Sequence, residues 1–210
     1  MHTDPVYIIG AGGHAKVVVD ALLSCGVDGS RIQVSDGNSA MLGKTLLGIP
    51  VQVPAVRAGM RGGWFHIAIG NGSVRANLAA QLVEAGARPL SVIHPSAVVA
   101  RSASIGGAVF IAANAVVGPD ATLAEGVIVN HGAVVDHDAV VGAFSHVAPN
   151  ATLAGGVRLG ARVLVGAGAN LLPAVVIGDN AVIGAGAVVL NNVLAGDTCV
   201  GVPAASKMKD

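Results

Sequence analysis

Ile177-Gly-Asp-Asn-Ala-Val182 is one unit of a six-residue repeat that occupies the second half of this chain. The segments Ile105-Gly-Gly-Ala-Val-Phe110 and Val117-Gly-Pro-Asp-Ala-Thr122 follow the same pattern. From Ile93 to Val200 the sequence divides into 18 units without an insertion, and position one is Val, Ile or Leu in 17 of them. A period of six fits neither a helix nor a simple alternating strand, so each unit is interpreted as a short strand followed by a bend.

The repeat predicts a β-solenoid with a narrow apolar interior. Three units would close one triangular coil, so 18 units predict about six coils, stacked by parallel backbone pairing about 4.8 Å apart. Position one sends a branched aliphatic side chain inward, and position five is Ala, Val, Ser or Cys in every unit. Glycine recurs at position two, where we expect the backbone to bend. Burial of one Val, Ile or Leu contributes roughly 1.5–3 kcal/mol before chain entropy is subtracted, so the column supplies a core.

Composition excludes several functional classes. The 210 residues carry 12 Lys and Arg against 12 Asp and Glu, so no basic surface for nucleic acid or an anionic membrane is expected. The mean hydropathy of +0.70 comes from repeat units that contain Gly, Asn or Pro, which argues against membrane spans. Two cysteines and an N-terminus without a basic-then-apolar segment predict a cytoplasmic protein with reduced thiols.

The first ninety residues read as a small Rossmann-like domain, followed by the solenoid domain over residues 91–210. A buried strand at 6–10 enters a Gly-rich turn, and a helix is expected from Lys16 to Ser24. Two further strands are expected at 31–34 and 66–69, and a second helix at 74–85. Three strands are too few for a complete dinucleotide-binding fold, so a mononucleotide or a nucleotide sugar fits better.

The Gly-rich turn is a candidate phosphate site. Amides at a helix N-terminus attract phosphate, and glycines let its oxygens approach the backbone. Gly12, Gly13 and His14 are therefore candidates to hold a diphosphate, while Asp36 follows the second strand and would contact a ribose or base. The competing interpretation is a tight strand-to-helix turn without a ligand.

Groups able to transfer protons at neutral pH gather in one part of the repeat. Asn130-His131 and Asp136-His137-Asp138 lie in neighbouring units, and His146 follows in the next. His137 is a candidate general base, because a carboxylate beside an imidazole raises its basicity and fixes its tautomer. Either Asp138 or Asp136 fits that role. Gly155 follows His137 by three repeat units, one coil away on the same face, where its N–H is suited to stabilise an oxyanion.

The chain resembles the bacterial sugar acyltransferases that join a small nucleotide-binding domain to a hexapeptide-repeat solenoid. The motifs that carry the resemblance are Ile8-Ile-Gly-Ala-Gly-Gly-His-Ala-Lys16, Ala68-Ile-Gly-Asn71, Asn130-His131 and Gly201-Val-Pro-Ala204. The resemblance implies a left-handed parallel β-helix and a homotrimer. Members include acetyltransferases of UDP- or GDP-linked amino sugars and sialic acid O-acetyltransferases.

The resemblance also implies roles for individual residues. His137 would be the base, Asp138 would increase its basicity and the Gly155 amide would bind the oxyanion. Acetyl-CoA, the cosubstrate, would lie between two subunits and contact His146, Ala167 and Ala185. The nucleotide-linked amino sugar would contact the following residues: Gly12, Gly13, His14, Asp36, Gly70, Asn130 and His131.

The preferred activity is N-acetylation of a nucleotide-linked 4-amino-4,6-dideoxy sugar, since the nucleotide domain would otherwise have no purpose in catalysis. The first alternative is O-acetylation of sialic acid or another sugar, which nucleotide binding would distinguish. A second is a metal lyase similar to the hexapeptide-repeat carbonic anhydrases, with His131, His137 and His146 as ligands. A third is a non-catalytic nucleotide-sugar sensor or scaffold.

Overall fold

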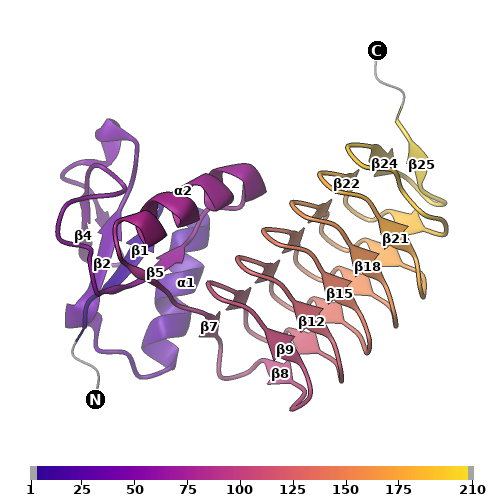
Figure 1. The fold of residues 1–210 in the computed structure, drawn as a ribbon, viewed down its shortest axis with the longest axis horizontal. Coiled ribbons are helices and arrows are strands. Elements are labelled where there is room, and N and C mark those ends of the chain that lie inside the picture. Colours follow the sequence, from indigo (N-terminus) through magenta and orange to yellow (C-terminus); the bar gives the residue numbers. More distant parts are fainter. Residues whose placement is uncertain (1–3, 208–210) are drawn as a thin grey trace. The chain divides into compact units, whose positions relative to one another are not determined.

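The computed structural model describes residues 4–207 and divides the chain into two compact units between Pro95 and Ser96. The sequence-based division was placed at residue 90. The fold class is as predicted: an α/β unit followed by a left-handed parallel β-helix (Figure 1). No helix among residues 4–207 is long and apolar enough to cross a membrane.

The N-terminal unit is built on a six-stranded sheet with the order β3-β4-β2-β1-β5-β6. Its strands and helices are β1 (Val6–Ile9), α1 (Gly13–Ser24), η1 (Gly29–Arg31), β2 (Ile32–Ser35), η2 (Ser39–Met41), β3 (Thr45–Leu46), β4 (Ile49–Gln52), β5 (Trp64–Ile67), α2 (Gly72–Glu84) and β6 (Arg88–Pro89). The short strand β7 (Val92–Ile93) ends the unit.

Strand β1 is central, and all four of its residues are buried, as a continuous apolar run predicts. It pairs in parallel with β2 and β5, so the ends of these three strands lie at one edge of the sheet. The three predicted strands and two helices are present, but β3, β4 and β6 were missed. Two of these contain only two residues, and β4 includes Pro50, which conceals a strand pattern.

The solenoid has three walls, each a stack of two-residue or three-residue strands. The first wall contains β10 (Phe110–Ile111), β13 (Ile128–Val129), β16 (His146–Val147), β19 (Leu164–Val165), β22 (Val182–Ile183), β24 (Thr198–Val200) and β25 (Ala205–Ser206). The second contains β8 (Val98–Val99), β11 (Val116–Val117), β14 (Val134–Val135), β17 (Thr152–Leu153), β20 (Asn170–Leu171) and β23 (Val188–Val189). The third contains β9 (Ser104–Ile105), β12 (Thr122–Leu123), β15 (Val140–Val141), β18 (Arg158–Leu159) and β21 (Val176–Ile177).

Successive coils keep an offset of three repeat units until the last coil. Leu153 pairs with Leu171, which in turn pairs with Val189. Ile183 instead pairs with Cys199, which is two positions short of that offset. The prediction of a repeat without a slip as far as Val200 is therefore wrong in its last coil, and the count of about six regular coils is only approximate. The shortened coil places Cys199 in the core position that the period assigns to another residue.

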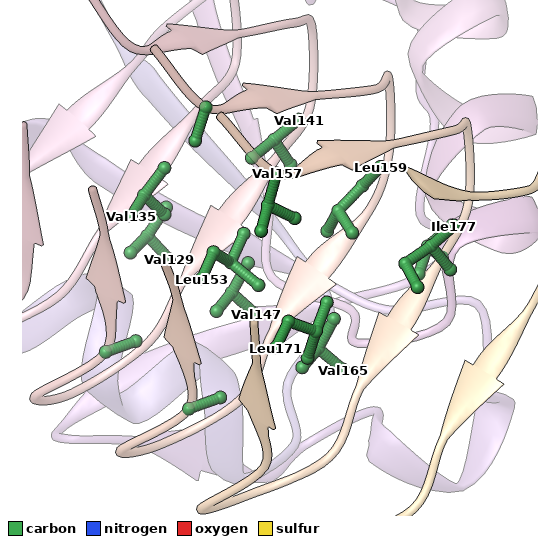
Figure 2. Packing of buried hydrophobic residues seen from close by; sticks show 14 of the residues in the cluster. Val129, Val135, Val141, Val147, Leu153, Val157, Leu159, Val165, Leu171 and Ile177 are labelled. Atoms are coloured by element: carbon green, nitrogen blue, oxygen red, sulfur yellow. The ribbon is translucent and has the colours of Figure 1, made fainter. Parts of the chain in front are cut away.

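The interior is formed by the residues at position one, as predicted, and also by the small residues at position five, which were expected only to let the wall turn. Figure 2 shows this column, in which Val129, Val147 and Val165 come from successive strands of the first wall. All three side chains are fully buried, as is Val157 at position five. Among the described residues, the cluster that fills the prism contains aliphatic side chains and Cys199 but no aromatic ring.

The corners of the coils repeat as strictly as the walls. Every sixth residue from Ala108 to Gly186 has a positive φ, including Asp138 and Asn150. These residues occupy position four, so the prediction that position-two glycines provide the bend is wrong. A β-carbon at Gly118, at position two, would lie 2.7 Å from the backbone nitrogen of His137 in the next coil. Position two favours glycine because adjacent coils pack too closely there for a side chain.

Candidate active site

Two corners of the solenoid contain the predicted catalytic and coenzyme residues. The first corner joins the first and second walls and includes residues 130–132, 166–168 and 184–186. The second corner joins the second and third walls and includes residues 136–138 and 154–156. Parallel pairing of β14 with β17 stacks the two segments of the second corner on each other.

The second corner holds a histidine between two carboxylates. Asp138 Oδ2 lies 2.8 Å from His137 Nδ1, and this contact fixes the ring so that Nδ1 carries the proton and Nε2 is the free acceptor. Asp136 Oδ1 accepts a hydrogen bond from the His137 backbone N–H at 2.7 Å. The sequence left open which aspartate pairs with the imidazole, and the structure has Asp138 in that position.

Both members of this pair are accessible. The side chains of His137 and Asp138 are 59% and 66% exposed, so a substrate can approach the imidazole directly. The pKa of His137 is raised above its usual value, chiefly by the hydrogen bond to the Asp138 carboxylate and further by the negative charge of Asp136. The arrangement produces a more basic imidazole whose Nε2 faces away from its carboxylate partner.

Gly155 lies directly against this imidazole. A β-carbon at Gly155 would come within 2.5 Å of both Cε1 and Nε2 of His137. Its neighbour Gly156 donates its N–H to the His137 carbonyl at 2.9 Å, and the Gly155 carbonyl accepts from Ala174 at 3.0 Å. Among the hydrogen bonds of residues 4–207, none uses the Gly155 N–H. An imidazole acceptor and an uncommitted amide therefore lie side by side.

His146 lies on the outer side of the first wall, in β16, where it is half-buried. Its Nε2 is 3.2 Å from Asn130 Nδ2. Asn130 Oδ1 already accepts the backbone N–H of His131 at 2.9 Å, so the amide nitrogen faces His146. His146 Nε2 is therefore an acceptor, and the ring proton lies on Nδ1, which makes Nδ1 a hydrogen-bond donor.

Ala167 and Ala185 are exposed and belong to the first corner. Gly186 donates its N–H to the Ala167 carbonyl at 2.8 Å, which confirms that the two alanines are in adjacent coils. His131 is in the same corner, and its carbonyl accepts from Asn150. This side of one chain thus combines the predicted coenzyme residues with Asn130 and His131.

The two corners form opposite edges of the second wall, so one chain does not unite the two sets of residues. His137 and Gly155 are at one edge, whereas His131 and Ala167 are at the other. The metal-lyase alternative requires His131, His137 and His146 to converge within a chain or between chains. Among residues 4–207, no group of three His, Cys, Asp or Glu residues is close enough to hold a metal ion.

In the N-terminal unit, the Gly-rich turn lies at the edge of the sheet where β1 and β2 end. Gly12 is the N-cap of α1, and neither Gly12 nor Gly13 has an atom within 4 Å of the place where a β-carbon would stand. His14 is half-buried in the first turn of the helix. The turn therefore leaves open space at a helix N-terminus, as phosphate binding requires.

Asp36 follows β2 and joins the two loops at this edge. Its Oδ2 accepts the Ala11 N–H at 2.7 Å, and its Oδ1 accepts the Asn38 N–H at 2.8 Å. Both carboxylate oxygens thus hold the backbone, a role that the sequence did not predict. Gly70, beyond the end of β5, is exposed at the same edge.

Two buried polar residues near this edge were missed. His66 in β5 and Arg75 in α2 are each 1% exposed. The sequence contained a signal for Arg75: it shares a helix face with the buried Ala79 and Leu82, where an apolar residue would be expected. A charged side chain within such a stripe indicates a specific buried partner.

Comparisons with known proteins find a family match in each of the two units. Residues 5–82 match the PglD N-terminal domain, and residues 156–191 match the bacterial transferase hexapeptide (six repeats). The structure is similar to that of PerB from Caulobacter crescentus in complex with CoA and GDP-perosamine, with 36% identity, a TM-score of 0.90 and 97% of each chain covered. The chain belongs to the bacterial hexapeptide-repeat sugar acyltransferase family.

Other members of this sugar acyltransferase family are similar over different lengths. The acetyltransferase domain of PglB from Neisseria gonorrhoeae FA1090, in complex with acetyl coenzyme A, is 32% identical with a TM-score of 0.88, over 97% of this chain and 99% of that one. UDP-N-acetylbacillosamine N-acetyltransferase from Bacillus subtilis (strain 168) is 37% identical over 111 residues, or 51% of each chain. The match thus spans about half the length of this curated relative.

Proposed function

We propose that this chain is an acetyltransferase that moves acetyl from acetyl-CoA to the amine of a nucleotide-linked 4-amino-4,6-dideoxy sugar. The observation that carries the proposal is the His137–Asp138 pair, whose imidazole lies against the Gly155 amide. The relatives support the class of both substrates, because their names include CoA, GDP-perosamine and UDP-N-acetylbacillosamine.

The reaction is a direct transfer. The sugar amine attacks the thioester carbonyl carbon, and His137 Nε2 accepts the proton that the amine loses as the C–N bond forms. The Gly155 N–H donates to the oxyanion of the tetrahedral intermediate. The C–S bond then breaks, the proton passes to the departing thiolate and CoA leaves as its thiol. Base catalysis of this kind contributes typically about 10²–10⁴-fold, so alignment of the two substrates must supply much of the remainder.

Acetyl-CoA would lie along the first wall and the first corner of a subunit. His146 would contact the coenzyme from that wall, where Asn130 Nδ2 lies 3.2 Å from its Nε2. Backbone groups of the exposed Ala167 and Ala185 would contact the pantetheine arm.

A homotrimer completes this site. The base and the coenzyme residues are at opposite edges of the second wall, so the thioester can reach His137 only if a neighbouring copy brings its first corner to that imidazole. Closed three-fold assembly supplies three identical sites of this kind. Each site would take His137, Asp138 and Gly155 from one subunit, and His146, with Asn130 and His131, from the next.

The nucleotide would bind at the carboxyl edge of the N-terminal sheet. Its diphosphate would contact Gly12, Gly13 and His14, where the turn leaves open space, and Gly70 would contact it from the neighbouring loop. Asp36 would face the ribose or base while its oxygens hold the Ala11 and Asn38 amides.

Thiol release from acetyl-CoA tests activity and acceptor together. Purified protein would be assayed with GDP-linked and UDP-linked 4-amino-4,6-dideoxy sugars, and with free sialic acid as the hydroxyl acceptor. Release with a nucleotide amino sugar, together with an acetylated product of the correct mass, supports the proposal. Release with sialic acid alone would replace it with O-acetylation, and no release with any acceptor would reject acetyl transfer.

A further inference from the structure

Arg75 is a buried cation directly behind the loop that joins β5 to α2. Its guanidinium Nη1 donates to the carbonyl oxygen of Ile69 at 2.7 Å and to that of Gly70 at 3.1 Å. The residue is 1% exposed and projects from the first part of α2. A single side chain therefore holds two successive peptide groups of this loop.

These two contacts fix the direction of the loop amides. The C=O and N–H of a trans peptide point in opposite directions. With the Ile69 and Gly70 carbonyls directed at the guanidinium, the N–H groups of Gly70 and Asn71 are directed away from it. Neither amide donates to a protein acceptor among residues 4–207, so both remain available at the edge where the nucleotide would bind.

The same loop supports the Gly-rich turn. A β-carbon at Gly10 would lie 2.9 Å from Ile69 Cγ1 and 3.0 Å from the Ala68 carbonyl oxygen. Ala68 also donates its N–H to the Ile9 carbonyl at 2.8 Å. The two loops are in direct contact, so a shift of Ile69 and Gly70 would move the turn that begins at Gly10.

The charge state of Arg75 suits a position behind a phosphate site. Desolvation lowers its pKa to about 10, so the guanidinium is still protonated at neutral pH. His66 is also buried, and desolvation lowers its pKa to about 4, so it is neutral there. Its Nδ1 lies 3.0 Å from the Leu90 carbonyl oxygen, to which the neutral ring donates. Arg75 is thus the cation of this buried pair.

We propose that Arg75 is a positioning residue for nucleotide-sugar binding, which acts through the Ile69 and Gly70 carbonyls and supplies a positive charge behind the diphosphate. The inference rests on the proposed function, because it assumes that this edge receives the nucleotide. Arg75 touches neither the reacting amine nor the thioester. Its loss should therefore weaken binding of the nucleotide substrate and leave the chemical step and acetyl-CoA binding unchanged.

The test compares Arg75→Met with Arg75→Lys in the full chain. Loss of charge-assisted hydrogen bonds predicts that Arg75→Met raises KM for the nucleotide sugar by about tenfold or more, while kcat and KM for acetyl-CoA stay within about twofold. Arg75→Lys keeps the charge and offers an ammonium in place of the planar guanidinium, so it should recover part of the lost affinity. Titration calorimetry with GDP and with UDP measures the same effect without turnover.

Leu82→Val is the matched control, because Leu82 is fully buried on the same face of α2 and its aliphatic side chain cannot hold the loop carbonyls. It should lower the melting temperature and leave KM unchanged. An Arg75→Met protein that binds nucleotide as tightly as wild type, or a Leu82→Val protein that loses affinity equally, would overturn the inference while acetyl transfer stands. If wild type binds nucleotide but releases no thiol with any amino sugar, the proposed function fails and the calorimetric comparison still decides the role of Arg75.

Discussion

The imidazole of His137 and the backbone of Gly155 occupy one corner of the solenoid, one coil apart. The space that a β-carbon at Gly155 would fill is already taken by His137 Cε1 and Nε2, each 2.5 Å away. The missing side chain therefore has two consequences: the ring can lie across the next coil, and the Gly155 N–H remains uncovered beside it. A general base and an oxyanion donor are brought together because the chain returns to the same corner after three repeat units.

Gly155→Ala should therefore abolish most of the activity. The added methyl group cannot share the space of the imidazole, so the ring must turn away from the amide. Displacement of a catalytic group by about 1 Å can cost on the order of 10²-fold in rate. We expect turnover, measured as thiol release, to fall by about that factor, with KM for acetyl-CoA little changed.

Gly156→Ala is the control, and it should lower the stability of the protein but leave most of the turnover. Gly156 has a φ of +70°, so a side chain there strains the backbone, but a β-carbon would meet only Ala174 at 3.9 Å. Such strain costs about 1–2 kcal/mol, so the melting temperature should fall while most of the turnover is kept. Equal losses of turnover in both variants would mean that the imidazole and the Gly155 amide do not act together.

His137→Asn should remove the base and preserve the fold. Asparagine is polar and neutral at this exposed corner, but it cannot accept a proton from an amine. Turnover should fall by about 10²–10⁴-fold while acetyl-CoA affinity, measured by calorimetry, stays near the wild-type value. The solved relatives include histidine-to-asparagine and histidine-to-alanine variants of perosamine N-acetyltransferase in complex with CoA and GDP-perosamine. Near-normal turnover of His137→Asn would assign the base to another residue.

The pH profile should report the Asp138–His137 contact. The base works as neutral imidazole, so kcat/KM rises with pH through the His137 pKa, which the carboxylate raises above its ordinary value. In Asp138→Asn the main cause of that shift is lost, while the charge of Asp136 remains. The acid limb should move to lower pH, towards about 6.5, and the rate at high pH should fall because the base is weaker. An unmoved acid limb would contradict the assignment. Because the substrate amine is the same in both profiles, its titration cannot cause a difference between them.

The solenoid was largely predictable because every repeat unit has the same pattern of residue types. An inward aliphatic and a small residue recur at fixed positions, so the walls and the core follow from the period alone. The shortened last coil was not predictable in this way. Cys199 satisfies the small-residue rule at position five, yet it pairs with Ile183, which is at position one of its own unit. Only the paired strands reveal that the last coil is shorter than the others.

The sequence predicted which residues of the candidate site stack on each other, because the repeat period determines this. It did not predict how their side chains are oriented. The stacking of His137 on Gly155 follows from their separation by three repeat units. The choice of Asp138 over Asp136 depends on side-chain direction at a residue of positive φ. The repeat period places Asn130 and His146 in neighbouring coils, but it does not predict that their side chains are in contact. The role of Arg75 depends on the burial of its side chain. The sequence indicates this burial only through the position of one arginine on the apolar face of a helix.

A mixed-subunit experiment should show that the site is shared between chains. His137→Ala removes the base from the second corner, and His146→Ala removes the coenzyme contact from the first wall. Each variant alone has three defective sites. In random mixed trimers formed at equal concentrations, about a quarter of the sites should combine an intact His137 with an intact His146 of the neighbouring subunit.

Co-expression with two different affinity tags isolates the mixed trimers, each of which has one intact site in three. Thiol release should therefore recover to about a third of the wild-type value if both variants are otherwise inactive. The control is a mixture of the two purified homotrimers without exchange, which should stay inactive. If His137 and His146 served one site within a single chain, every chain in the mixture would lack one of them and no activity would return. Recovery therefore distinguishes a shared site from a self-contained one, because no chain in the mixture carries both histidines.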